Sequence, residues 1–148
     1  MPFITLARAI LLLRVSLALV FIIHATVRIL NNSTGNFGEF LNSKGFSFGT
    51  AIVWMITVFE IVGGIILAIG NYVKPLSLCF IFILLMGIIL IHLPLGWFVG
   101  EHGTGGMEYS VILIIAFITV MAAENKESNW VISTKKQRRN SAEHNQLL

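Results

Sequence analysis

Four long apolar runs, separated by short polar breaks, make up most of the chain. Each run is close to the roughly 20 residues that an α-helix needs to cross the hydrocarbon core of a bilayer, at about 1.5 Å per residue. The breaks are rich in Gly, Asn and Pro, which are typical of turns. The pattern predicts an all-α fold, a membrane four-helix bundle with four transmembrane helices. The expected spans run from about Ala7 to Leu30, Gly49 to Ile69, Leu76 to Val99 and Met107 to Ala123.

The composition agrees with lipid as the solvent. Of the 148 residues, 56% are hydrophobic and 11% are charged, and the mean hydropathy is +0.86. A soluble domain of this length carries roughly a quarter of its residues as charged side chains to cover its surface. The lipid bilayer is therefore the first predicted partner. The single cysteine, Cys79, lies in an apolar run, which excludes an intramolecular disulfide and a thiolate metal cluster.

Basic residues gather at the carboxyl end of the chain. The net charge is +3, and five of the ten Lys and Arg residues lie in the segment 126–148, which has no apolar pattern. We therefore expect a four-helix transmembrane domain over residues 1–125 and a basic, disordered cytoplasmic tail over residues 126–148. Nucleic-acid binding is not expected, because the basic run is short and lacks a folded face with aromatic readers. Since Arg8 and Lys74 mark the same side as the tail, the positive-inside rule predicts that both termini are cytoplasmic.

Several ionisable residues interrupt the apolar runs. A charge at mid-span costs about 2.5 kcal/mol or more, so it usually faces protein or water and finds a partner. At about 100° per residue, Arg14, His24 and Arg28 share one stripe of the first helix. Glu60 shares a stripe of the second helix with Val53, Ile56, Thr57 and Leu67, and with Gly63 and Gly64, which are expected to allow close helix packing. The ionisable residues are Arg14, His24, Arg28, Glu60, His92 and Glu108.

The expected depths of these residues along their helices place most of them toward one side of the membrane. With the helices running alternately outward and inward, Glu60 lies near the middle, while both histidines, Arg28 and Glu108 lie toward the outside. Pro94 removes a helical hydrogen bond and is expected to kink the third span near this level. The sequence thus predicts a polar pocket that opens outward and suits a small polar or redox ligand, or a proton path.

The same residues also support a structural interpretation. In it, Glu60 or Glu108 pairs with Arg28 and only holds the helices together. A bis-histidine haem on His24 and His92 is geometrically feasible, but it has no attachment motif in this sequence and is not favoured. A zinc site from His92, Glu101, His102 and Glu108 lacks recognised ligand spacing, so no metal site is predicted.

Four short motifs, in chain order, resemble the DoxX family of small bacterial four-helix membrane proteins. The resemblance extends from about Leu12 to Thr119, and the chain has a basic tail where the family has a Gly-Pro-rich segment. In the first helix, the family's His-Gly-x-x-Lys corresponds to His24-Ala25-Thr26-Val27-Arg28, with Ala and Arg in place of Gly and Lys. The other matching residues are the early arginine Arg14, the run Glu60-Ile61-Val62-Gly63-Gly64 that continues to Gly70, His92 with Gly96-Trp97-Phe98, and Gly105-Gly106-Met107-Glu108-Tyr109.

The resemblance implies a bacterial inner-membrane protein linked to redox chemistry. Relatives are associated with a thiosulfate:quinone oxidoreductase and with a membrane complex that handles thiol stress. The resemblance adds Tyr109 to the pocket expected from His24, Arg28, Glu60, His92 and Glu108, with a quinone-like or other small ligand. Because the chain has no electron-carrier motif, we expect a subunit of a membrane complex with a protein partner, not an enzyme alone. The sequence does not identify catalytic residues. It also leaves open whether the protein forms a homo-oligomer. More distant relatives act as assembly factors, so a non-catalytic scaffold is the alternative.

Overall fold

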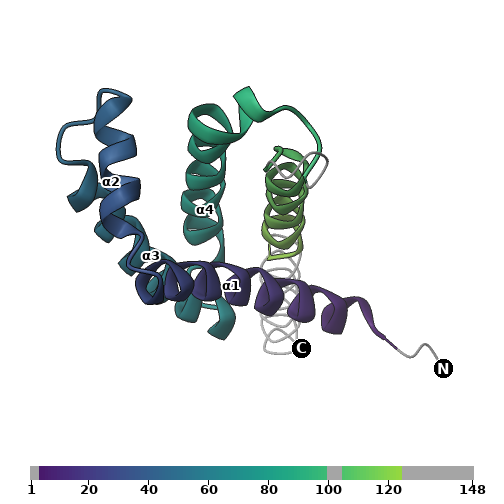
Figure 1. Ribbon diagram of the computed structural model, residues 1–148. Helices are drawn as coiled ribbons and strands as arrows, with labels where there is room; N and C mark the ends of the chain where they lie inside the picture. Colours follow the sequence, from purple (N-terminus) through teal and green to yellow (C-terminus); the bar gives the residue numbers. More distant parts are fainter. Residues whose placement is uncertain (1–3, 100–104, 125–148) are drawn as a thin grey trace, which may run out of the picture.

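The computed structural model describes residues 4–99 and 105–124, and this part of the chain is helical without strands (Figure 1). Residues 108–124 form a further helix, the C-terminal helix, drawn in green in Figure 1. The expected basic tail, residues 126–148, lies outside the described residues. The labelled helices are α1 (Leu6–Leu30), α2 (Thr34–Ser43), α3 (Gly49–Ile69) and α4 (Val73–Gly87), and α4 continues as the π-helix η1 (Ile88–His92) and the 3-10 helix η2 (Leu93–Leu95).

Three of the helices are long and apolar enough to cross a membrane. They are Leu6–Leu30, Gly49–Ile69 and Val73–Leu95, with mean hydropathies of 2.4, 2.4 and 2.8. These ranges confirm the first three predicted spans within a few residues. Large hydrophobic side chains on all three helices are exposed on the outside of the protein, which is the surface that lipid covers. The chain is therefore a small membrane protein, and the crossing by the C-terminal helix stays a prediction.

A cluster of phenylalanine rings joins four helices at the centre of the protein. Phe21 of α1 lies 4.5 Å from Phe80 of α4 between ring centroids, and 5.7 Å from Phe117 of the C-terminal helix. Phe59 of α3 lies 5.1 Å from Phe80, and the rings of Phe80 and Phe117 are stacked at 5.4 Å. Phe80 and Phe117 have no exposed surface. Offset aromatic pairs of this kind stabilise a core beyond their buried area, and they fix the C-terminal helix beside α1 and α4.

One face of α3 is buried along its whole length, as predicted. The buried residues of this helix are Gly49, Val53, Thr57, Glu60, Gly63, Gly64 and Leu67. The two central glycines have different neighbours. A Cβ atom on Gly64 would lie 2.8 Å from Ile22 Cγ1 and 3.3 Å from the Ala18 carbonyl oxygen of α1, whereas one on Gly63 would make ordinary contacts with Phe59 and Leu76. Gly64 therefore sets the close approach of α1 and α3.

The helix α2 was not predicted from the sequence. Its ten residues contain Gly, Asn, Glu and Ser and lack a long apolar run, so the sequence pattern indicates only a break between two spans. The structure shows a short amphipathic helix that buries Gly38 and Leu41 against the start of α3. The contact is tight, because a Cβ atom on Gly38 would lie 2.6 Å from the Thr50 Cα, and one on Gly49 would overlap the Gly38 carbonyl oxygen. The Asn42 side-chain oxygen also accepts a 2.7 Å hydrogen bond from the Gly49 amide.

The third span loses its α-helical geometry near Pro94, as the sequence predicts. The α-helix ends at Gly87, and the next five residues, which end at His92, adopt π-helical geometry. Pro94 then lies in a single 3-10 turn, and Gly96 follows with φ of 86°. Since proline has no amide hydrogen and clashes with the carbonyl one turn earlier, the backbone relaxes by widening the preceding turn.

Candidate functional site

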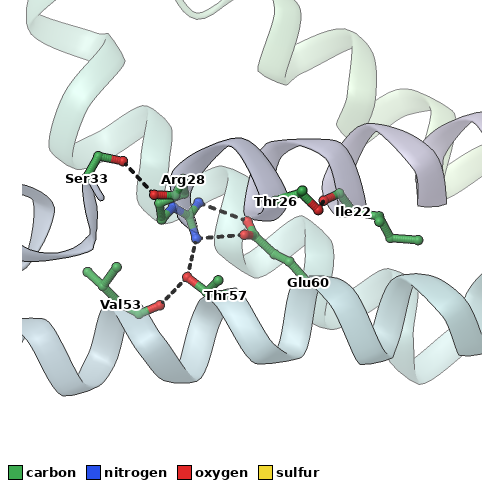
Figure 2. A network of polar contacts seen from close by, with 7 residues as sticks. All are labelled: Ile22, Thr26, Arg28, Ser33, Val53, Thr57 and Glu60. Atoms are coloured by element: carbon green, nitrogen blue, oxygen red, sulfur yellow. Dashed lines mark hydrogen bonds and ion pairs between the residues drawn. The ribbon is translucent and has the colours of Figure 1, made fainter. Parts of the chain in front are cut away.

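A buried ion pair joins α1 to α3 near the end of α1. The Arg28 Nη1 atom lies 2.8 Å from Glu60 Oε2, and Arg28 Nη2 lies 3.4 Å from Glu60 Oε1, so the guanidinium spans both carboxylate oxygens (Figure 2). Arg28 is 8% exposed and Glu60 is 2% exposed. A charge-assisted pair in a low-dielectric interior is short and directional. Of the two partners that the sequence left open for Arg28, the structure selects Glu60.

Thr57 completes this network from the same face of α3. Its Oγ1 atom accepts a 2.8 Å hydrogen bond from Arg28 Nη1 and donates a 2.7 Å hydrogen bond to the Val53 carbonyl oxygen (Figure 2). The single hydroxyl proton is therefore committed to the helix backbone, and the hydroxyl oxygen can only accept from Arg28. Thr57 has no exposed surface. Its position on the Glu60 stripe was predicted, but no sequence signal indicates its contact with Arg28.

The start of α2 lies against the other side of Arg28. The Ser33 hydroxyl and the Ser33 amide both donate to the Arg28 carbonyl oxygen, at 3.2 and 3.1 Å, and this closes the turn between α1 and α2. The Arg28 Cζ atom lies 5.6 Å from the centroid of the Phe37 ring. This distance is within the range of a cation–π interaction. The guanidinium is thus held between α3 and α2.

An open cavity of about 460 Å³ lies beside this network. This volume is within the range of sites for small molecules. Polar groups from α1 and from the start of α2 line one part of it, and apolar side chains from α1, α2 and η1 line the rest. The lining residues are His24, Val27, Arg28, Ser33, Asn36, Phe37 and Ile91. Two predicted pocket residues, His24 and Arg28, are among them. The sequence reasoning missed Ser33, Asn36 and Phe37, because it predicted no helix in their segment.

The electrostatics of the cavity wall follow from the ion pair. Arg28 carries five N–H groups, of which three bond to Glu60 and Thr57, so further N–H groups remain for a ligand. The Glu60 carboxylate compensates the guanidinium charge. The Ser33 proton is already donated to the backbone, so this side chain offers an acceptor. The wall therefore combines polar groups with little net charge.

The other predicted pocket residues make separate contacts. His92 Nδ1 lies 3.1 Å from the Gly105 carbonyl oxygen, and Glu108 accepts a 2.9 Å hydrogen bond from the Val99 amide. Both contacts join the end of the third span to the start of the C-terminal helix. Tyr109 is 50% exposed on the outside of that helix. None of these three residues lines the cavity, although Ile91, the neighbour of His92, does.

Within residues 4–99 and 105–124, no group of three or more His, Cys, Asp or Glu side chains is placed to hold a metal ion. Cys79 is exposed on the outside of α4.

These features define a small helical membrane protein with an ion pair buried between two of its apolar helices. A family model described as DoxX matches residues 9–93, which is more than half of the chain. The chain belongs to the DoxX family. The matched segment contains the whole cavity lining and ends next to Pro94, so it does not include the C-terminal helix. Searches of curated proteins and of solved structures found no match to this chain.

Proposed function

We propose that this protein is a small subunit of a membrane redox assembly in the bacterial inner membrane, and that its cavity binds a neutral, quinone-like ligand. The observation that carries the proposal is the cavity wall, where Arg28 is held by Glu60 and Thr57 and still has N–H groups to donate. A quinone oxygen accepts hydrogen bonds, and the quinone ring would pack against Phe37 and Ile91. Because Glu60 already balances the guanidinium, a neutral ligand fits this wall better than an anion.

Each residue has a specific role in this proposal. Arg28 and the side-chain amide of Asn36 donate to a ligand oxygen, and His24 donates or accepts a proton when the ligand changes redox state. Reduction of a quinone to a quinol takes up two electrons and two protons, and a protein partner supplies the electrons. Glu60 acts as the counter-charge of Arg28, since it lies behind Arg28 and outside the cavity lining. His92, Glu108 and Tyr109 are not assigned to ligand contact.

Quinone content and quinone affinity test the proposal. Protein purified in mild detergent is expected to carry quinone in its lipid extract and to bind a soluble short-chain quinone saturably. His24→Ala and Asn36→Ala each remove one hydrogen-bonding group from the wall, so each is expected to weaken binding about two- to tenfold. Glu39→Ala is the matched control, because Glu39 is an exposed residue of α2 outside the cavity lining. Equal affinity in all three variants would contradict the proposal.

The second candidate function is that of a non-catalytic scaffold or assembly factor. The observation in its favour is that the Arg28 and Glu60 charges satisfy each other inside the protein. The double replacement Arg28→Met with Glu60→Leu separates the two candidates, because an apolar pair of similar volume can replace a buried ion pair without loss of stability. A scaffold keeps its cellular function in this variant. A quinone-binding subunit loses it, together with quinone affinity, while the protein stays folded.

A further inference from the structure

Arg14 reaches the opposite end of the helix pair from Arg28. Its guanidinium lies against Gly70, the residue that ends α3, and a Cβ atom on Gly70 would lie 2.8 Å from Arg14 Nη2 and 2.9 Å from Cζ. Gly70 has φ of 93°, a left-handed conformation that side chains rarely adopt. Glycine at this position therefore has two roles: it adopts the left-handed backbone turn, and its lack of a side chain leaves room for the guanidinium. Through this contact the Arg14 charge lies at the turn between α3 and α4.

The Arg14 charge has no counter-charge within the part of the chain that the structure describes. In residues 4–99 and 105–124, the one ion pair joins Arg28 to Glu60. Arg14 is half-buried, and its Nε atom is fully buried without a hydrogen-bond partner among these residues. A cation in an apolar span is costly unless an anion or water compensates it. The guanidinium is thus placed to bind an oxygen anion from outside the described chain.

The surroundings of the α3–α4 turn match an anionic lipid. Lys74 adds a second positive charge four residues after Gly70, and the first turn of α4 has no acidic residue. Apolar side chains flank the turn on the outside, with Ile69 68% exposed and Leu78 58% exposed. Tyr72 is exposed within the turn itself, and tyrosine is typical of the lipid headgroup level. The turn therefore combines cations for a headgroup with an apolar surface for acyl chains.

We propose that Arg14 and Lys74 bind the phosphodiester of an anionic phospholipid at the α3–α4 turn. The planar guanidinium donates two parallel hydrogen bonds to phosphate oxygens, and Lys74 contributes a point charge. The acyl chains of the same lipid lie along the exposed side chains of Ile69 and Leu78. A lipid, not free phosphate, is the ligand, because these apolar residues are part of the site. The site is independent of the cavity at Arg28.

Lipid-dependent stability of the full chain tests this site. The protein is reconstituted in nanodiscs of phosphatidylcholine alone or with phosphatidylglycerol, and its thermal unfolding is followed. Phosphatidylglycerol is expected to raise the unfolding temperature of the wild type. Arg14→Gln is expected to lose this shift, and Arg8→Gln is expected to keep it. Arg8 is the matched control because it is an exposed arginine of the same helix near the same end.

Two further measurements distinguish a lipid from free phosphate and provide a second variant if Arg14→Gln does not fold. Inorganic phosphate added to phosphatidylcholine nanodiscs is expected to leave the unfolding temperature unchanged, whereas an equal rise would assign the site to free phosphate and overturn the lipid proposal. If Arg14→Gln does not fold, Lys74→Gln is used, and native mass spectrometry is expected to show about tenfold weaker binding of phosphatidylglycerol, the loss of one charge-assisted contact. Lipid binding that is unchanged in Lys74→Gln, or lost equally in Arg8→Gln and Arg14→Gln, overturns the proposal.

Discussion

At the scale of single residues, Arg28 and Glu60 depend on each other. Both are almost fully buried and they meet at 2.8 Å. Removing one partner leaves an uncompensated charge in the interior, whereas removing both leaves an apolar contact. Arg28→Met alone is therefore expected to destabilise the protein by about 3–5 kcal/mol. Adding Glu60→Leu is expected to recover most of this loss.

Reversible unfolding in mixed micelles measures these differences in the free energy of unfolding. The two single variants and the double variant form a thermodynamic cycle, which isolates the coupling between the two side chains. Additive losses in the double variant would show that the pair is not coupled in the membrane protein.

Ser77 is a buried polar residue whose replacement, unlike that of Arg28, is not expected to destabilise the protein. It lies on the buried face of α4 with no exposed surface, and its Oγ atom has no hydrogen-bond partner in the described part of the chain. A buried hydroxyl without a partner loses its hydration and gains nothing in return. Ser77→Ala is therefore expected to leave the unfolding temperature unchanged or to raise it. A lower unfolding temperature than that of the wild type would mean that the hydroxyl has a partner.

The sequence predicted the buried charges better than their pairing. Glu60 was expected to face a neighbouring helix because a carboxylate among apolar residues cannot face lipid, and it does so. Arg28 had two candidate carboxylates at similar depth, and depth alone could not choose between them. The choice depends on the crossing of α1 and α3, which Gly64 sets, and this geometry is a property of packing. His24, expected on the inward stripe, is exposed and lies on the cavity wall.

At the scale of secondary structure, α2 is the element that sequence reasoning missed. The long apolar helices were predicted because about 20 consecutive apolar residues are typical of a transmembrane helix. A ten-residue amphipathic helix gives a weak periodic signal, and its formation depends on docking against α3 through Gly38 and Gly49. Because α2 supplies part of the cavity wall, missing it also meant missing Asn36 and Phe37.

This docking can be tested within α2 itself. Gly38→Ala is expected to displace α2, because the added methyl group would overlap the Thr50 backbone. Gly35→Ala is the matched control, because a Cβ atom there meets nothing within 4 Å. Alanine also favours a helix over glycine by about 1 kcal/mol, so Gly35→Ala is expected to be neutral or stabilising.

Limited proteolysis of the α2 segment and the thermal unfolding temperature report on the two variants. Faster cleavage and a lower unfolding temperature are expected for Gly38→Ala only. Equal behaviour of the two alanine variants would contradict the close contact between α2 and α3.

At the scale of the whole molecule, the number of membrane crossings determines where the termini lie. Three helices meet the length and hydropathy of a span, and the C-terminal helix packs into the same aromatic core through Phe117. If this helix also crosses, the even number of spans puts both termini on one side, and the Lys and Arg distribution makes that side the cytoplasm.

Reporter fusions at each end test this topology. A green fluorescent protein fused to either terminus is expected to fluoresce, and a periplasmic phosphatase fused at the same positions is expected to be inactive. Phosphatase activity at the carboxyl terminus, together with fluorescence at the amino terminus, would mean an odd number of crossings and would exclude the four-span topology.

Quinone binding by the cavity is tested by titrating a soluble short-chain quinone into purified wild-type protein, Thr57→Val and Thr57→Ser. Valine keeps the shape of threonine but removes the oxygen that holds Arg28, whereas serine keeps that oxygen. We expect saturable binding to the wild type, similar binding to Thr57→Ser, and affinity lower by about tenfold in folded Thr57→Val. No saturable binding to the wild type, or equal binding to the valine and serine variants, would contradict this expectation.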